Sequence, residues 1–250
     1  MSAKRSGAEQ AYLESEVASI PYWYHRIDMG GGLVTPGWSP ISHEAYRVPD
    51  RFDGERILDV GAWDGYWTFH AANRGAVSVH AIDDFSDQLG TGVSRQDAWK
   101  SFDVARKAFP RINATRQEMS VYDVYSKFSH IPFDRVFFFG TLYHLRHPLL
   151  ALDALRSVMK PGAILHVESA ILDDIQSPYT KRKHDESGCY AEFYPNSEFG
   201  SNPTNWWVPT LNCLGALLEA AGFDQVETWK LTDTPQSLAH CRGFAVGIAN

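Results

Sequence analysis

A short apolar stretch that ends in an acid and two spaced glycines constrains the fold of this chain more than any other feature. Residues 57–66 read ILDVGAWDGY, and a helical pattern of apolar residues follows them. A second apolar run over residues 77–82 then ends in Asp83. Two parallel strands joined by a helix produce this order, and glycine lets the backbone of the first turn approach a ligand closely. The sequence therefore predicts one half of a nucleotide-binding βαβ unit.

The spacing of the glycines indicates which ligand this unit binds. Dinucleotide sites favour G-x-G-x-x-G, because a pyrophosphate rests on the helix N-terminus. Here three residues separate Gly61 from Gly65, and the bulky Trp63 stands where a middle glycine would be. S-adenosylmethionine (SAM) carries a ribose but no phosphate, and Asp83 follows Gly61 at about the 20-residue distance of a ribose-binding acid. We expect SAM as the cofactor; a glycine turn without a ligand is the alternative.

The composition narrows the class of protein. The chain of 250 residues is 44% hydrophobic with a formal net charge of −7, which fits one α/β domain with additions and disfavours a large nucleic-acid footprint. Its three scattered cysteines, without metal-ligand spacing, are typical of reduced cytosolic proteins. The polar N-terminus lacks the core of a signal peptide, and no apolar run approaches the ~20 residues of a membrane span. We expect a cytoplasmic protein without a membrane partner; its oligomeric state is left open.

Alternating strand and helix patterns predict the fold class. We expect an α/β fold with a mostly parallel, seven-stranded sheet and helices on both faces. The continuous apolar run at 136–139 predicts a central strand that is buried on both faces. Strands are expected at 56–60, 77–82, 111–115, 133–139, 163–169, 223–230 and 242–248, and helices at 8–20, 64–74, 94–108, 148–158 and 210–221.

Two aromatic segments accompany this core. We expect residues 1–50 to form an N-terminal helix and an aromatic lid segment, and residues 51–250 to form the SAM-binding domain. A connection as long as 170–209 is usually functional or disordered, and its aromatic and amide side chains argue against disorder. We interpret it as a substrate lid inserted in the domain. The residues expected to bind the substrate come from both segments: Tyr24, His25, Trp38, Tyr190, Tyr194, Asn205 and Trp206.

Two stretches of the chain resemble class I SAM-dependent methyltransferases. They are residues 59–65 (DVGAWDG) and 139–148 (FGTLYHLRHP). The chain is most similar to the subgroup related to the tRNA wobble-uridine (5-oxyacetyl- and methoxyuridine) methyltransferase, which carries a similar G-x-L-Y-H-x-x-x-P-L segment after its fourth strand. Residues 23–28 (WYHRID) and 33–37 (LVTPG) resemble the beginning of shorter members of that subgroup. The resemblance covers roughly residues 20–248 and implies a Rossmann-like methyltransferase fold.

The resemblance also implies a set of cofactor-binding residues. Asp59 and Gly61 would face the methionine end of SAM, and the residues after the third strand would flank the adenine. At Ser120 the alternative is a plain helix N-cap, with Asp123 in the first turn. The full set expected to contact the cofactor is Asp59, Gly61, Ala62, Asp83, Asp84, Ser120, Val121, Gly140 and Tyr143.

Three residues near the ends of the fourth and fifth strands are candidates for catalysis. Ligands of open α/β sheets bind at the carboxyl ends of the strands, where Tyr143, His144 and Glu168 are expected. Glu168 ends a buried strand, and a buried carboxylate needs a partner or a ligand. It is the first candidate for contacting the proton of the acceptor, and His144 is the second; a structural ion pair and a backbone-bonded histidine are the alternatives. His144 and His147 have no evident third ligand, so no metal site is expected.

These observations favour methyl transfer from SAM to a small, partly aromatic or apolar molecule. Rings are dense in both lid segments, whereas a tRNA-binding surface is basic. The tRNA enzyme uses a carboxylated SAM held by basic residues. Here residues 38–47 contain no lysine, and Phe244 stands where we expect the C-terminal arginine, so ordinary SAM is the expected donor. A tRNA wobble-uridine methyltransferase and a SAM-binding regulatory protein without turnover are the alternatives.

Overall fold

The computed structural model describes residues 5–88 and 97–250. Its centre is a seven-stranded sheet in the order β3-β2-β1-β4-β5-β9-β8. Only β9 runs against the other strands, so the sheet is mostly parallel, as expected. The strands are β1 (Arg56–Val60), β2 (Ser78–Asp83), β3 (Ala114–Glu118), β4 (Phe133–Phe139), β5 (Met159–Ala170), β8 (Phe223–Lys230) and β9 (Arg242–Ala249).

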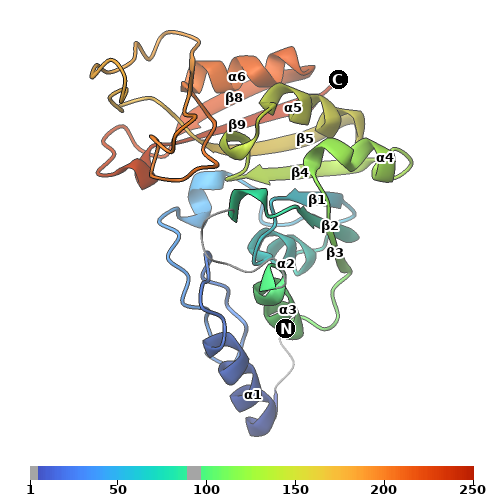
Figure 1. Cartoon of the computed structure of the whole chain (residues 1–250). Coiled ribbons are helices and arrows are strands. Elements are labelled where there is room, and N and C mark those ends of the chain that lie inside the picture. The colour runs from blue at the N-terminus through green and yellow to red at the C-terminus, as the bar shows by residue number, and fades with distance from the viewer. Residues whose placement is uncertain (1–4, 89–96) are drawn as a thin grey trace.

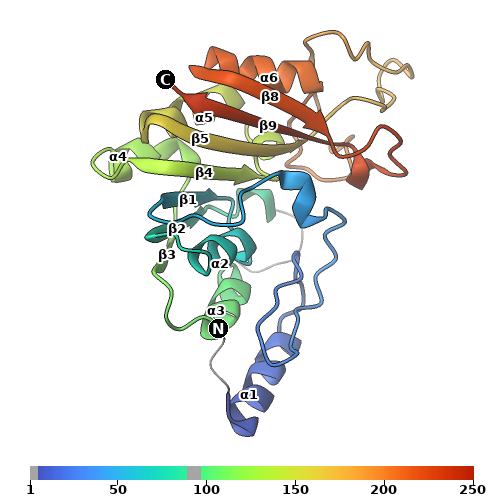
Figure 2. The same ribbon diagram turned by 180° about the vertical axis from the view of Figure 1, so that it is seen from behind.

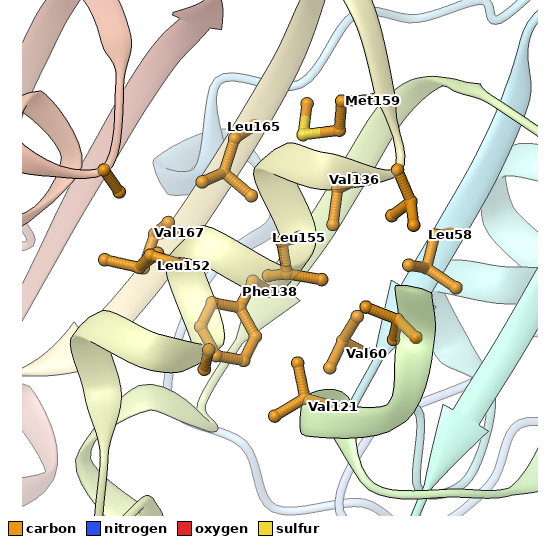
Figure 3. Packing of buried hydrophobic residues seen from close by; sticks show 14 of the residues in the cluster. Leu58, Val60, Val121, Val136, Phe138, Leu152, Leu155, Met159, Leu165 and Val167 are labelled. Carbon is orange, nitrogen blue, oxygen red and sulfur yellow. The ribbon is translucent and has the colours of Figure 1, made fainter. Parts of the chain in front are cut away.

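Helices cover both faces of this sheet (Figures 1 and 2). α2 (Tyr66–Ala72) and α3 (Lys100–Lys107) pack on one face, and α4 (Val124–Phe128), α5 (Pro148–Ser157) and α6 (Leu211–Ala220) pack on the other. Figure 3 shows the second layer, where Leu152 and Leu155 of α5 pack near Val136 and Phe138 of β4. Alternate residues of β4 face α2, so β4 is the central strand, buried on both faces, that its apolar run predicts.

The structure departs from the expected elements at several places. β5 begins at Met159 and not at residue 163, and no expected range covers the short helix α4. β3 begins at Ala114 and not at residue 111; its side chains are mostly exposed at the edge of the sheet, so no apolar pattern marks its ends. A second antiparallel pair, β6 (Ala191–Phe193) and β7 (Trp207–Pro209), is absent from the expected elements. Three residues are too few for a periodic signal. The first residues of the helix expected at 94–108, 94–96, lie outside the described part of the chain.

The two segments expected as lids lie at the edge where the parallel strands end (Figures 1 and 2). α1 (Gly7–Ala18) packs against α3 through Leu13 and Val17, and a capping box of Ser6 and Glu9 starts it. The chain then runs along this edge to the short helix η1 (His43–Tyr46) and on to β1. Residues 171–206 lie at the same edge. In the ranges 5–88 and 97–250, no helix combines the length and apolar character needed to cross a bilayer.

Candidate active site

A cavity of about 1040 Å³ opens at the carboxyl edge of the sheet. The turn after β1, the ends of β2, β4 and β5, the start of β9, the N-terminal segment and part of the lid segment all contribute to it. Residues 238–239, in the loop before β9, also line it and were not expected. The expected site residues that line this cavity are Tyr24, His25, Trp38, Asp59, Gly61, Ala62, Asp83, Asp84, Val121, Gly140, Tyr143, His144, Glu168 and Asn205.

Four expected residues do not line the cavity. Ser120 occupies the N-cap position of the short helix η4 (Val121–Asp123), but its side chain makes no capping hydrogen bond. Tyr194 is buried in an apolar cluster that also contains Tyr143 and Phe199 of the cavity wall, and Tyr190 is 46% exposed. The ring of Trp206 lies 4.4 Å from the guanidinium carbon of a neighbouring arginine. We therefore leave Ser120, Tyr190, Tyr194 and Trp206 out of the proposed site.

The turn after β1 is closed against β2, and the protein itself requires its glycines. The N–H groups of Gly61 and Ala62 donate to the carbonyl of Ile82 at 2.9 and 3.2 Å. Gly61 has a φ of 73°, and a Cβ there would lie 2.0 Å from Oγ1 of Thr141. A Cβ on Gly65 would lie 2.5 Å from a ring carbon of α2. These close approaches are to side chains of the protein, whereas the sequence had indicated an approach to a ligand.

Buried carboxylates stand at the ends of β1 and β2. Asp59 accepts a hydrogen bond from Oγ1 of Thr68 at 2.6 Å, and burial raises the pKa of Asp59 to about 6. Asp83 accepts from the backbone N–H groups of Trp63 at 3.0 Å and Phe85 at 2.8 Å. Both side chains are therefore fixed in direction while they remain part of the cavity wall.

The acidity of this wall suits a cationic ligand. Asp84, Asp87 and Asp97 also line the cavity, together with Lys100. Burial, and next the charge of Asp87, raises the pKa of Asp83 well above its ordinary value. A positive ligand relieves such repulsion, and ribose hydroxyls can donate to the lone pairs that remain on Asp83. The sulfonium, ammonium and ribose of SAM match these features, so the residues present fit this cofactor.

Aromatic rings of the N-terminal segment form another part of the cavity wall. The rings of Tyr22 and Tyr24 lie 5.5 and 5.8 Å from the ring of Trp63. Trp38 packs edge-on against Tyr24 at 5.3 Å, and its indole N–H donates to the hydroxyl of Tyr22. Trp63 has a φ of 43°, a left-handed conformation that is uncommon outside glycine. The turn after β1 thus contributes a ring to the wall as well as backbone.

Asp64 anchors this aromatic segment to the same turn. Its buried carboxylate accepts from the backbone N–H groups of Tyr24 at 3.1 Å and His25 at 2.8 Å, and lies 2.7 Å from Nδ1 of His25. Burial alone would raise the pKa of Asp64, but the nearby His25 and these hydrogen bonds hold it below its ordinary value. The His25 ring stacks on Tyr66 at 4.9 Å. His25 is thereby fixed at the cavity, with Nε2 as its remaining nitrogen.

His144 follows β4 and holds the lid segment. Its Nδ1 lies 3.0 Å from Oγ1 and 3.2 Å from the carbonyl oxygen of Thr204. Burial lowers the pKa of His144 to about 3, so the ring is neutral at physiological pH. The carbonyl of Tyr143 accepts from the N–H of Trp206 at 2.9 Å. These bonds tie residues 204–206 to the loop after β4, which matches the alternative reading of a histidine bonded to the backbone.

A buried ion pair closes the far end of the cavity. Oε1 of Glu168 lies 3.3 Å from Nη1 of Arg242, and the two side chains are 2% and 13% exposed. The guanidinium carbon of Arg242 lies 5.1 Å from the centroid of the Tyr143 ring. Burial raises the pKa of Glu168, although the charge of Arg242 opposes the shift. The structural ion pair considered as the alternative for Glu168 is therefore present, and it lies in the cavity wall.

Sequence reasoning missed Arg242 and Asp64. The resemblance predicts an arginine at position 244, where Phe244 is instead buried and stacks on Trp229 with centroids 5.5 Å apart. Residues 242 and 244 lie on the same face of β9, because successive side chains of a strand alternate between its two faces. The arginine is therefore present two residues before the expected position, on the same face. Asp64 was read only as part of the glycine spacing, and nothing local shows that it binds Tyr24 and His25.

The sequence matches a known domain family over most of its length. The family, described as a methyltransferase domain, matches residues 40–228. The chain belongs to this methyltransferase family. S-adenosyl-L-methionine is the cofactor of such methyltransferases, in agreement with the acidic wall of the cavity. The resemblance noted in the sequence is thereby confirmed at the level of the family.

Curated relatives carry the name tRNA U34 carboxymethyltransferase. The protein from Pseudomonas aeruginosa (strain LESB58) is 27% identical over 208 residues, which are 82% of this chain and 56% of the relative. The one from Azotobacter vinelandii is 28% identical over 205 residues, 80% of this chain and 55% of the relative. The chain thus spans little more than half the length of these relatives.

Solved methyltransferase-fold structures show the same architecture. The N-terminal domain of EvdMO1, crystallised in the presence of S-adenosylhomocysteine (SAH) and D-fucose, matches with a TM-score of 0.61 at 17% identity, covering 98% of this chain and 100% of that one. The [4+2]-cyclase SpnF matches with a TM-score of 0.60 at 16% identity, covering 96% and 94%. At these identities the likeness shows the class I methyltransferase fold.

Proposed function

We propose that this protein transfers a methyl group from SAM to a small acceptor bound in the cavity. The observation that carries the proposal is the continuity of the cavity, because one space joins Asp59 and Asp83 to Glu168, the aromatic wall and four residues of the lid segment. Its volume of about 1040 Å³ is at the upper end for a small-molecule site, about 300–1,000 Å³. A protein that only binds SAM has no need of space beyond the cofactor.

The residues at the two ends of the cavity have different roles, cofactor binding at one end and proton transfer at the other. Asp59 would hold the ammonium of the cofactor and Asp83 its ribose. Bound SAM supplies a methyl group on a positively charged sulfur, so the protein mainly positions the acceptor and receives its proton. Glu168 is placed for the proton, because it lines the cavity and burial raises its pKa. The neutral His144 ring, engaged with Thr204, positions the lid segment.

The walls support an acceptor that is partly aromatic or apolar. Tyr22, Tyr24, Trp38 and Trp63 line one side, and Phe199 of the lid segment lines another. Small-molecule sites are mostly apolar with a few placed polar groups. Both segments expected as lids contribute to this enclosure, which supports their proposed role around the acceptor.

A second candidate is methylation of a tRNA uridine, which the name of the curated relatives favours. Such an activity requires a basic surface, because phosphate contacts dominate the affinity for nucleic acids. The chain carries a net charge of −7, and carboxylates crowd the cavity. The small acceptor is therefore the first proposal.

The deciding experiment supplies the purified protein with SAM that carries a deuterated methyl group. Parallel reactions contain a metabolite extract or total tRNA, and mass spectrometry detects the label. We expect a labelled small molecule in the extract. Label in tRNA alone would establish the second candidate. Tight binding of SAH by calorimetry without label in either pool would favour a regulatory protein.

A further inference from the structure

The ion pair at the far end of the cavity has hydrogen-bonding capacity that the protein does not use. Glu168 lies on β5 opposite Phe244 of β9, and Arg242 lies opposite Ala170, so the side chains of Glu168 and Arg242 share one face of the sheet. Their charged atoms are 3.3 Å apart, but the geometry is not that of a hydrogen bond. Within the described residues, Oε1 of Glu168 and both Nε and Nη1 of Arg242 are buried without a hydrogen-bond partner.

Unmet polar atoms of this kind are rare in protein interiors. A buried donor or acceptor without a partner costs about 1–3 kcal/mol, and more when the group is charged. Here two donors and one acceptor are unmet side by side, and both side chains line the cavity. A bound ligand that supplies partners for Oε1 and Nη1, which lie 3.3 Å apart, would remove part of this cost. The unmet atoms of Glu168 and Arg242 therefore indicate which polar group a ligand places beside them.

Three common polar groups can be compared with this pattern. A carboxylate would accept from Arg242 but would bring a second negative charge beside Glu168. An ammonium would donate to Glu168 but would face the positive charge of Arg242. A hydroxyl donates one hydrogen bond and accepts two, and it brings no charge. Of these three groups, only the hydroxyl pairs with both the unmet Oε1 and the unmet Nη1 without repulsion.

We infer that the methyl acceptor is an alcohol or phenol whose reacting hydroxyl is bound between Glu168 and Arg242. This inference rests on the proposed function and names the substrate class of the same site. The hydroxyl donates to Oε1 of Glu168 and accepts from Nη1 of Arg242, which leaves one lone pair of its oxygen to attack the methyl group. Glu168 and Arg242 both touch the substrate and act on the oxygen that reacts.

The bonds and charges of the step balance with these two residues. The hydroxyl oxygen forms the new bond to the methyl carbon, and the carbon–sulfur bond breaks with its electron pair going to sulfur, which becomes neutral. The O–H proton moves to Oε1 of Glu168, which becomes a neutral acid. Arg242 keeps its charge and stabilises the negative charge that develops on oxygen while the proton leaves. The products are a methyl ether and SAH, and the proton leaves Glu168 to solvent afterwards.

The first test identifies the atom that carries the label. The full chain is incubated with a metabolite extract and deuterated-methyl SAM, and fragmentation of each labelled product locates the methyl group. We expect a methyl ether. A methyl group on nitrogen, sulfur or carbon would overturn this inference and leave the proposed methyl transfer standing. Absence of any labelled small molecule would instead overturn the proposed function.

Variants of the pair test its roles with the alcohol or phenol so identified. E168Q should lower kcat at least 100-fold, because it keeps the shape but cannot take the proton, with SAH affinity changed less than threefold. E168D should retain part of kcat. In the wild type, kcat should fall as pH falls through the raised pKa of Glu168, and this limb should vanish in E168Q. An E168Q enzyme with wild-type kcat would overturn the role.

Arg242 is tested by binding as well as by turnover. Calorimetry with the same acceptor and SAH should show at least tenfold weaker acceptor binding in R242Q, with R242K intermediate because it keeps the charge. Exposed Glu219 and Arg111 provide matched controls, E219Q and R111K, which should match the wild type. Thermal melting identifies any variant that fails to fold, and R242K then carries the test. Unchanged acceptor affinity in folded R242Q or R242K would overturn the inference.

Discussion

Gly61 shows how a single missing Cβ fixes the geometry of the site. Alanine at this position would combine a φ of 73° with a Cβ 2.0 Å from Oγ1 of Thr141. We expect G61A to lower the free energy of unfolding by about 3 kcal/mol, from backbone strain and overpacking together. Urea denaturation measures it. G54A is the matched control, because Gly54 has a φ of 81° with nothing within 4 Å and should lose only about 1 kcal/mol.

A double-mutant cycle separates the two causes at Gly61. T141A removes the hydroxyl that a Cβ would meet, so G61A/T141A should be more stable than the sum of the single changes implies. If the single changes simply add, the contact with Thr141 is not the source of the loss.

Asp83 carries the clearest expectation for the cofactor. Its two oxygens each accept one backbone hydrogen bond, so each keeps a lone pair, and the residue lines the cavity. Loss of two hydrogen bonds to a charged group, about 1.5–3 kcal/mol each before water replaces them, should make D83A bind SAH about 30- to 1,000-fold more weakly. Calorimetry at neutral pH measures it, with D123N, on an exposed aspartate, as control. Equal affinity in D83A and wild type would remove Asp83 from the cofactor site.

The N-terminal segment is the element whose placement depends on one side chain. Asp64 accepts from Tyr24 and His25 and is completely buried. In D64N an amide replaces one acceptor oxygen, and we expect a loss of about 3 kcal/mol in the free energy of unfolding. Hydrogen exchange of residues 20–38 should become faster. Exchange confined to other segments would show that Asp64 does not hold this one.

The carboxylate of Asp64 should also make the protein less stable at low pH. The pKa of Asp64 is lowered in the folded protein. The contribution of Asp64 to the free energy of unfolding is therefore complete above the pKa of an unfolded aspartate, about 3.9. It is lost as pH falls through the lower pKa of Asp64 in the folded protein. Urea titrations between pH 7 and pH 3 should show a smaller decrease in stability for D64N than for the wild type. Parallel curves would contradict the lowered pKa.

Elements with a strong local pattern were predictable from the sequence, and those defined by a partner were not. β1, β2 and β4 end within one residue of the expected positions, because apolar runs bounded by glycine or charge mark them. β3 has exposed polar residues, and β6 and β7 exist only as each other's partner. The division of the chain at residue 50 stays a prediction.

The same distinction holds for the site. Gly61 and Asp83 could be placed because the βαβ unit fixes their spacing. The contact of Asp64 with His25 and that of Glu168 with Arg242 join residues far apart in the chain, and no spacing rule predicts either. Tyr190 and Trp206 were chosen for ring content alone, which does not distinguish a cavity wall from the outer surface of a lid.

At the scale of the whole molecule, the charge of the cavity determines which donor it accepts. Carboxylates surround the cofactor end, and Glu168 already balances Arg242 at the other end. A donor with an additional carboxylate would meet this mostly negative field, in which Lys100 and the ion-paired Arg242 are the only lysine or arginine side chains among the described lining residues. We expect SAM to bind at least tenfold more tightly than carboxylated SAM, in competition calorimetry at about 0.15 M salt.

The E168Q variant tests this argument, because it frees Arg242 from its counter-charge. The preference for SAM should narrow or reverse in E168Q, while E219Q should keep the wild-type preference. Tighter binding of the carboxylated donor by the wild type would show that Arg242 serves the donor and not the acceptor.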